Sequence, residues 1–271
     1  MAAILHAAWN AVVKSGSDKY FNMTAIVVGH APPALLALQF VPLPDPASLP
    51  YMVAGAALHF GYQIFLLRAY DLGEFTQVYP IARGTAPLLV AAISVLALGV
   101  TLSPLQVLAI AVIGAGIASL CLVRAIDGNR NTAAAVMALI TACFIAGYSL
   151  VDGYGARLAG TAVGFFSWLA ILDSIAMAIF VAVTRPGLLT RIARDGKMIT
   201  MTGGSASFLA YVIVVWAFTQ APIALVTALR ETSIVFALLI GVFVMKERLS
   251  LTKLASTFAA LFGAALLKFA R

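Results

Sequence analysis

The chain has 271 residues, of which 63% are hydrophobic and only 10% are charged. Soluble domains average about 25% charged residues, so this chain has too few polar side chains to cover a surface in water. These proportions exclude a soluble enzyme, a nucleic-acid binder and a disordered tail, and they indicate an integral membrane protein. The net charge of +7 then fits loops that face anionic lipid.

Charged residues, prolines and glycines divide the chain into apolar runs, each close to the roughly 20 residues that cross a bilayer. In chain order the ten runs are 1–15, 20–41, 51–70, 75–99, 104–125, 132–153, 161–184, 198–220, 222–246 and 250–269. We therefore predict an all-α integral membrane protein with ten transmembrane helices and no extramembrane domain. His30, beside Pro32 and Pro33, marks a kink in the second run.

The first run is short for a full crossing, and a cleaved signal peptide is the alternative. No basic residues precede its apolar stretch, as they would in a signal peptide; Lys14 and Lys19 follow it instead. We therefore expect a first spanning helix whose start is a few residues short.

Lysine and arginine are distributed unevenly between alternate loops. Of the 17, twelve fall in the loops of one side, three in those of the other, and Arg83 and Arg230 lie inside predicted helices. Because cytoplasmic loops are enriched in basic residues, the twelve predict the cytoplasmic side of a multi-pass protein of the cell inner membrane. With ten helices, both termini then face outward.

The two halves of the sequence match weakly. An ungapped shift of 147 residues aligns Arg83 with Arg230 and Thr85 with Thr232. Arginine inside a span is rare, so its match with a second arginine indicates a duplication. With five helices in each half, the second copy must be inverted, which is typical of secondary transporters. We predict one five-helix repeat at 1–125, a cytoplasmic linker at 126–131 and a second repeat at 132–271.

Three stretches also resemble the EamA-type members of the drug/metabolite transporter superfamily. Residues 78–87 (VYPIARGTAP) resemble their fourth helix, residues 6–11 (HAAWNA) with Lys14 their first, and residues 246–250 (KERLS) the turn between their last two. The resemblance covers both halves, and it implies ten helices in two inverted repeats and alternating access on small metabolites, often for export. The matching first-half turn, residues 99–103 (GVTLS), lacks the acid.

Polar side chains inside the predicted helices form the candidate site. Arg83 and Arg230 would each cost about 2.5–3.5 kcal/mol at mid-membrane, so each needs a carboxylate, an aqueous cavity or an anionic ligand beside it. They either bind the carboxylate or phosphate of a substrate or form structural ion pairs, with Glu231 and Asp173 as candidate partners of Arg230. A desolvated carboxylate can take up a proton, so Glu231, and after it Asp173, are the candidates for proton coupling.

Two polar stripes at helical spacing add further candidates. One consists of His6, Asn10 and Lys14, and the other of His59 and Gln63 with Tyr62 beside them. Such stripes either line a pathway or join neighbouring helices by hydrogen bonds, and Tyr79 lies one turn before Arg83. The candidate substrate-binding residues are Arg83, Tyr79, Asn10, His6, Arg230, Gln63, Tyr62 and His59.

The sequence contains no motif for catalysis, for a metal site or for nucleotide binding. We therefore predict no enzyme, metal or cofactor, and a secondary active transporter that exports a small polar or amphipathic metabolite. Its expected partners are an anionic or zwitterionic small molecule and the lipid bilayer, with no nucleic acid; a homodimer is left open. The alternative is a non-transporting membrane subunit or a lipid-handling, flippase-like protein, whose buried polar groups would all satisfy each other.

Overall fold

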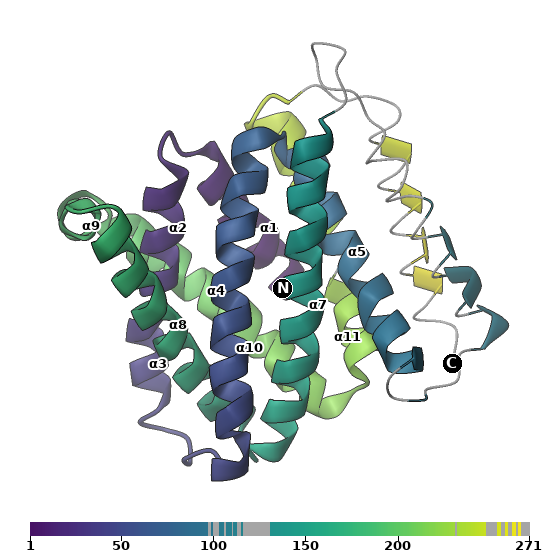
Figure 1. Cartoon of the computed structure of the whole chain (residues 1–271), viewed down its shortest axis with the longest axis horizontal. Coiled ribbons are helices and arrows are strands. Elements are labelled where there is room, and N and C mark those ends of the chain that lie inside the picture. Colours follow the sequence, from purple (N-terminus) through teal and green to yellow (C-terminus); the bar gives the residue numbers. More distant parts are fainter. Residues whose placement is uncertain are drawn as a thin grey trace. The chain divides into compact units, whose positions relative to one another are not determined.

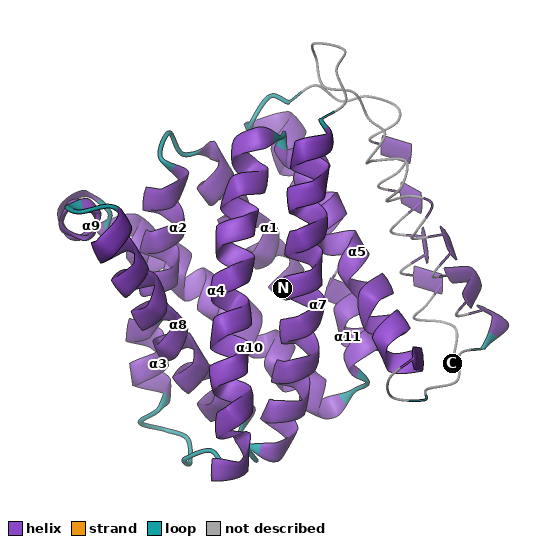
Figure 2. Cartoon of the chain, viewed as in Figure 1, coloured by secondary structure: helices purple, strands orange, loops and turns teal. Residues whose placement is uncertain are grey.

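The computed structural model describes residues 1–96, 131–230 and 232–247, with short pieces between 99 and 115 and between 254 and 266. Every regular element in these residues is a helix, so the all-α prediction is confirmed (Figure 2). The helices are α1 Ala2–Ser15, α2 Lys19–Val28, α3 Ala31–Ala37, α4 Leu49–Leu72, α5 Phe75–Leu96, α7 Thr132–Leu158, α8 Ala162–Thr184, α9 Leu188–Asp195, α10 Gly204–Gln220, α11 Ile223–Arg230 and α12 Ser233–Leu239. Shorter turns are the 3-10 helix η1 Pro46–Ser48 and the π-helices η2 Ile199–Gly203 and η3 Ile240–Val244.

The predicted fold class of ten transmembrane helices in two inverted five-helix repeats is wrong. Within the described residues, three helices are long and apolar enough to cross a membrane: Thr132–Leu158, Ala162–Thr184 and Ile199–Gln220. The length and composition of these three helices are compatible with a membrane location.

Several of the runs that fail do so for identifiable reasons. The helix α1 has 14 residues, and the run 20–41 is divided into helices of 10 and 7 residues. The run 222–246 is likewise divided, with α11 ending at Arg230 and α12 beginning at Ser233. In α4, mid-helix polar residues such as His59 and Gln63 lower the hydropathy. Most of the predicted helices 104–125 and 250–269, and the linker up to residue 130, lie outside the described residues.

The described chain divides into two compact units. Unit 1 comprises Met1–Gln63 and Leu150–Ala221, and unit 2 comprises Ile64–Ser149 and Pro222–Arg271. Each unit therefore combines an early segment of the sequence with a later one, and the boundaries fall inside α4 and α7. The proposed duplication of 1–125 and 132–271 is a different division and stays a prediction.

The helix α8 organises unit 1. It packs against α2, α3 and α10, and α10 packs in turn against α1 (Figure 1). Its packed face is largely apolar. Its exposed face is apolar as well, with Trp168, Leu172, Ile175, Ile179 and Val183. A helix at a water-exposed surface has a polar outer face, so this outer stripe is of the kind that suits a lipid environment.

The second apolar run breaks completely at Gly29 and His30, where the sequence predicts a kink. Pro32 and Pro33 lack the N–H groups that would continue the hydrogen bonds of α2. Gly29 also lies against the backbone of another segment, since a Cβ built on it would collide with the Thr200 carbonyl oxygen. Close packing of the two backbones therefore accompanies the break.

In unit 2, Glu247 caps the helix α5, which packs against α11, α12 and η3. Its Oε1 accepts a hydrogen bond from the Phe75 N–H at 2.7 Å, and its Oε2 accepts one from the Thr76 N–H at 2.8 Å. The first N–H groups of a helix have no partner within the helix, and a negative charge is favourable there. The acid of the stretch 246–250 therefore joins the end of η3 to the start of α5.

Asp18 caps α2 and pairs with Arg191 of α9. Its Oδ1 accepts from the Phe21 N–H at 3.0 Å, and its Oδ2 accepts from the Arg191 guanidinium. Burial would raise the pKa of Asp18, but the Phe21 N–H and the Arg191 guanidinium outweigh it and hold the pKa below its usual value of 3.8. The ionised form of Asp18 therefore stabilises the fold.

We expect Asp18→Asn to lower the free energy of unfolding by about 0.5–1 kcal/mol at neutral pH, because asparagine keeps the capping acceptor but loses a surface ion pair. Because the pKa of Asp18 is lower in the folded state, ionised Asp18 contributes to the free energy of unfolding at pH values above 3.8. This contribution is lost as the pH falls through the pKa of the folded state. Unfolding in mild detergent over a pH series should show the two proteins converging in acid. A constant difference down to low pH would contradict this assignment.

Candidate functional site

Asp152 of α7 is the centre of a buried hydrogen-bonded cluster in unit 1. It is 0% exposed, its Oδ2 lies 2.8 Å from His59 Nε2, and the same oxygen accepts from Tyr211 Oη at 2.7 Å. The cluster thus joins α4, α7 and α10. Among the described residues Asp152 Oδ1 has no hydrogen-bond partner. It lies close to Gly55, because a Cβ added to Gly55 would be 2.5 Å from this oxygen.

A second buried pair lies one helical turn further along α4. Gln63 Nε2 donates to Asp173 Oδ2 of α8 at 2.6 Å, and both residues are buried. Since Gln63 follows His59 by four residues, the two side chains lie on the same face of α4. Gln63 Oε1 and Asp173 Oδ1 accept no hydrogen bond from any described residue.

Aromatic rings surround the first pair. The His59 ring meets the Tyr211 and Tyr62 rings edge to face, with centroids 5.0 and 6.4 Å away. On α1, the His6 ring lies 6.3 Å from the Tyr211 ring, and the Asn10 amide donates to the His6 carbonyl of its own helix at 2.8 Å. The stripe on α1 therefore places His6 beside the cluster.

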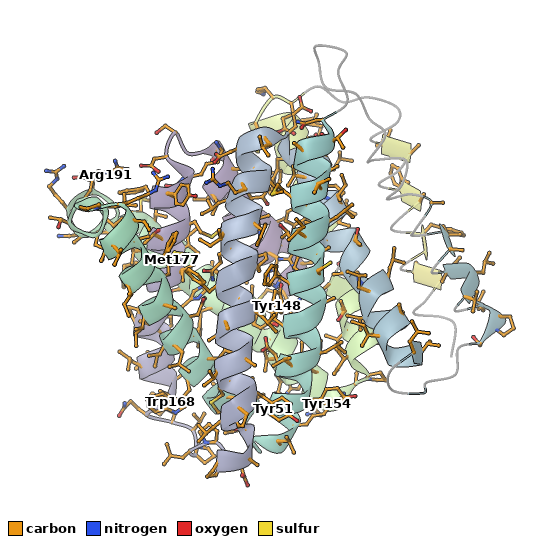
Figure 3. The ribbon with its side chains drawn as sticks, in the orientation of Figure 1. Tyr51, Tyr148, Tyr154, Trp168, Met177 and Arg191 are labelled. Atoms are coloured by element: carbon orange, nitrogen blue, oxygen red, sulfur yellow. The ribbon has the colours of Figure 1, made fainter. Side chains whose placement is uncertain are left out.

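The two ends of unit 1 differ chemically. Tyr51, Tyr154 and Trp168 lie toward one end and Arg191 lies at the other (Figure 3). Further basic residues lie at the ends of helices or just beyond them: Lys14 in the last turn of α1, Lys19 at the start of α2, Arg185 after α8, Arg194 on α9 and Lys197 after it. Aromatic residues at membrane interfaces and basic residues in cytoplasmic loops are distributed in this way.

Unit 2 contains two buried arginines in similar surroundings. Arg83 is 2% exposed and its guanidinium carbon lies 5.6 Å from the centre of the Tyr79 ring; Tyr79 Oη donates to Ser233 Oγ at 3.0 Å. Arg230 is 4% exposed, and its guanidinium carbon lies 5.8 Å from the centre of the Tyr148 ring. Its Nη2 donates a hydrogen bond to Ser149 Oγ at 3.4 Å. Each guanidinium therefore has an aromatic ring beside it.

The structure separates the predicted site residues into two groups. His59, Gln63 and Asp173 join the cluster of unit 1, with Tyr62 beside them on α4 and His6 and Asn10 on α1. Tyr79, Arg83 and Arg230 belong to unit 2. Asp173 was one of the two candidate partners of Arg230, but in the structure it accepts a hydrogen bond from Gln63. Glu231 lies outside the described residues, so its role in proton coupling stays a prediction. Within the described part of the chain, no three metal-ligating side chains come together.

Asp152 is the functional candidate that the sequence analysis missed. The predicted run ends at residue 153, which places Asp152 at a helix terminus, whereas α7 continues to Leu158. The signal that could have revealed it is the stretch that follows, in which no charged residue occurs until Arg157. Asp152 is thus well inside its helix, as a functional acid would be.

No protein-family model and no curated protein sequence matches this chain. Its fold, however, matches 26 chains of solved structure. For the crystal structure of one such protein, the TM-score is 0.68 at 19% sequence identity, with 99% of this chain and 95% of that chain covered. A likeness at this identity shows a shared fold alone, so the function is argued from the residues.

Proposed function

We propose that this chain is a secondary carrier of the cell inner membrane that moves a small anionic or zwitterionic metabolite. The observation that carries the proposal is the two-sided character of α8. Its outer face exposes the apolar side chains of Trp168, Leu172 and Ile175, whereas Asp173 is buried on its packed face. Ionisable residues inside membrane helices that face the protein interior mark substrate or ion pathways.

The buried oxygens of unit 1 favour a carrier over a structural subunit. A subunit without transport activity would satisfy its buried polar groups internally. Within the described residues, however, Asp152 Oδ1, Asp173 Oδ1 and Gln63 Oε1 have no hydrogen-bond partner. A buried polar group without a partner costs about 1–3 kcal/mol, which is acceptable where the group must be available to a ligand or a proton.

The two buried arginines indicate the chemistry of the cargo. A guanidinium binds carboxylate or phosphate through two parallel hydrogen bonds, and Arg83 and Arg230 are both shielded from solvent. The resemblance of residues 78–87 to EamA-type carriers supports the same class of activity, and membership of that family is part of this proposal. We place the basic end of unit 1 in the cytoplasm.

Uptake into proteoliposomes tests the proposal, with labelled amino acids, organic acids, sugar phosphates and nucleotides as the panel. We expect one anionic or zwitterionic class to be taken up. Arg83→Gln should weaken its apparent affinity about 10- to 100-fold, because a charge-assisted hydrogen bond contributes about 1.5–3 kcal/mol. Arg194→Gln is the matched control, since Arg194 is exposed and pairs with Asp195 at 2.8 Å, and it should leave uptake unchanged.

Two results would contradict the proposal. If the folded protein takes up no class in the panel but moves fluorescent lipid between the leaflets of the same vesicles, the chain handles lipid. If uptake occurs and Arg83→Gln behaves as Arg194→Gln does, the cargo does not bind Arg83.

A further inference from the structure

The Asp173–Gln63 pair can form one hydrogen bond in two opposite directions. As observed, the Gln63 N–H donates to Asp173 Oδ2 at 2.6 Å, which suits an ionised carboxylate because that group only accepts. A protonated carboxyl has an O–H to donate, and the amide has a carbonyl oxygen to receive it. Rotation of the Gln63 amide by half a turn would bring Oε1, which has no partner among the described residues, toward Asp173.

The charged and titratable groups around Asp173 come from several elements. His59 lies on α4, and Asp152 lies on α7 and accepts a hydrogen bond from Tyr211 of α10. Among the described buried residues of unit 1 there is no lysine or arginine. A buried carboxylate without a fixed cation is costly, so the addition of a proton to Asp173 removes an unfavourable charge.

The two carboxylates of unit 1 differ in how they are held. Asp152 Oδ2 is contacted by both His59 and Tyr211, which together hold its carboxylate. Among the described residues, Asp173 accepts one hydrogen bond, and its donor is an amide that can become an acceptor. Of the two acids, Asp173 is therefore the one whose surroundings accommodate both the charged and the neutral form.

We propose that Asp173 binds and releases the proton that is coupled to transport, and that Gln63 reverses its hydrogen bond each time. In the charged form the Gln63 N–H donates to the carboxylate; in the neutral form the Asp173 O–H donates to the Gln63 carbonyl. Asp173 takes one proton from water when it becomes neutral and returns it to water when it becomes charged, and no other covalent bond is made or broken.

Infrared spectroscopy of the full-length protein over a pH series tests this inference without a substrate. We expect a band of a buried protonated carboxyl group to grow in acid. The band should be absent in Asp173→Asn and retained in Asp152→Asn, which is the matched variant within the same cluster. A band that persists in Asp173→Asn, or that disappears only in Asp152→Asn, overturns the assignment.

A second variant keeps the inference testable if Asp173→Asn does not fold. Gln63→Leu leaves the carboxyl group in place but removes the amide carbonyl that would accept its O–H. The carboxyl band of this variant should shift in frequency, because its hydrogen bond is lost. An unshifted band would show that Gln63 does not receive the proton's hydrogen bond.

The coupling itself rests on the proposed carrier function, and a transport assay separates the two claims. With the substrate found in the uptake panel, Asp173→Asn should retain exchange of substrate across the vesicle membrane but lose at least tenfold of the accumulation driven by a pH gradient. Asp195→Asn, an exposed acid on α9, should retain both. If the wild type transports but ignores the gradient, the proton role fails and the carrier stands. If the infrared band belongs to Asp173 but nothing is transported, the carrier fails and the proton site stands.

Discussion

Gly204→Ala is expected to prevent native packing of unit 1 and to lower the free energy of unfolding by about 3 kcal/mol or more. A Cβ on Gly204 would lie 2.5 Å from the Gly29 Cα and 2.6 Å from its carbonyl oxygen. Both are backbone atoms, which cannot rotate away as the end of a side chain can. The break after α2 would have to move away from η2 and α10, and the packing of α2 and α3 against α8 would move with it.

The neighbouring glycine provides the control for this result. A Cβ on Gly203 would lie 3.0 Å from Ile26 Cγ1, which belongs to a side chain that can adjust. Alanine is also preferred over glycine within a helix by about 1 kcal/mol, so Gly203→Ala should change the stability by no more than that amount. Thermal unfolding in detergent, followed by circular dichroism, measures both variants. Equal stabilities for the two would show that the contact between Gly29 and Gly204 is not tight.

Glu247→Ala is expected to cost about 2–4 kcal/mol, because two hydrogen bonds from helix N–H groups to a charged acceptor are lost at once. Glu247 follows Thr76 by 171 residues in the chain. Removal of its carboxylate would therefore release the start of α5 from the end of η3. Glu247→Gln has one acceptor oxygen left and should lose about half as much. Unfolding curves for the series would contradict the cap if glutamine and alanine destabilise equally or if neither does.

The helices α7, α8 and α10 could be predicted from the sequence because their apolar runs are continuous. Run 161–184 corresponds to the observed Ala162–Thr184, and run 198–220 to Ile199–Gln220. The overestimate of spanning helices arises where an apolar run contains a break that composition does not reveal. Pro32 and Pro33 predict a kink in residues 20–41, but not that the helix is divided. The division at Gly29 accompanies a contact with Thr200 and Gly204, which lie far away in the sequence.

The candidate site was predictable to a similar extent. Helical spacing places His59 and Gln63 on one face of α4 and Tyr79 one turn from Arg83, and the structure has both arrangements. The partners on other helices could not be predicted, because the packing of α4 against α7 and α8 depends on contacts between segments about 90–110 residues apart. Asp152 was missed for a local reason, since the end of α7 was placed too early.

The composition of unit 1 from two distant segments has a consequence for its biogenesis. At about 5–20 residues per second, roughly 4–17 seconds of synthesis separate Gln63 from Leu150. During that interval the ribosome has already delivered His59 and Gln63, while Asp152 and Asp173 are still to be translated. The amino-terminal part of unit 1 is therefore made before the segment against which it packs, and it reaches its native packing only after that later segment has been synthesised.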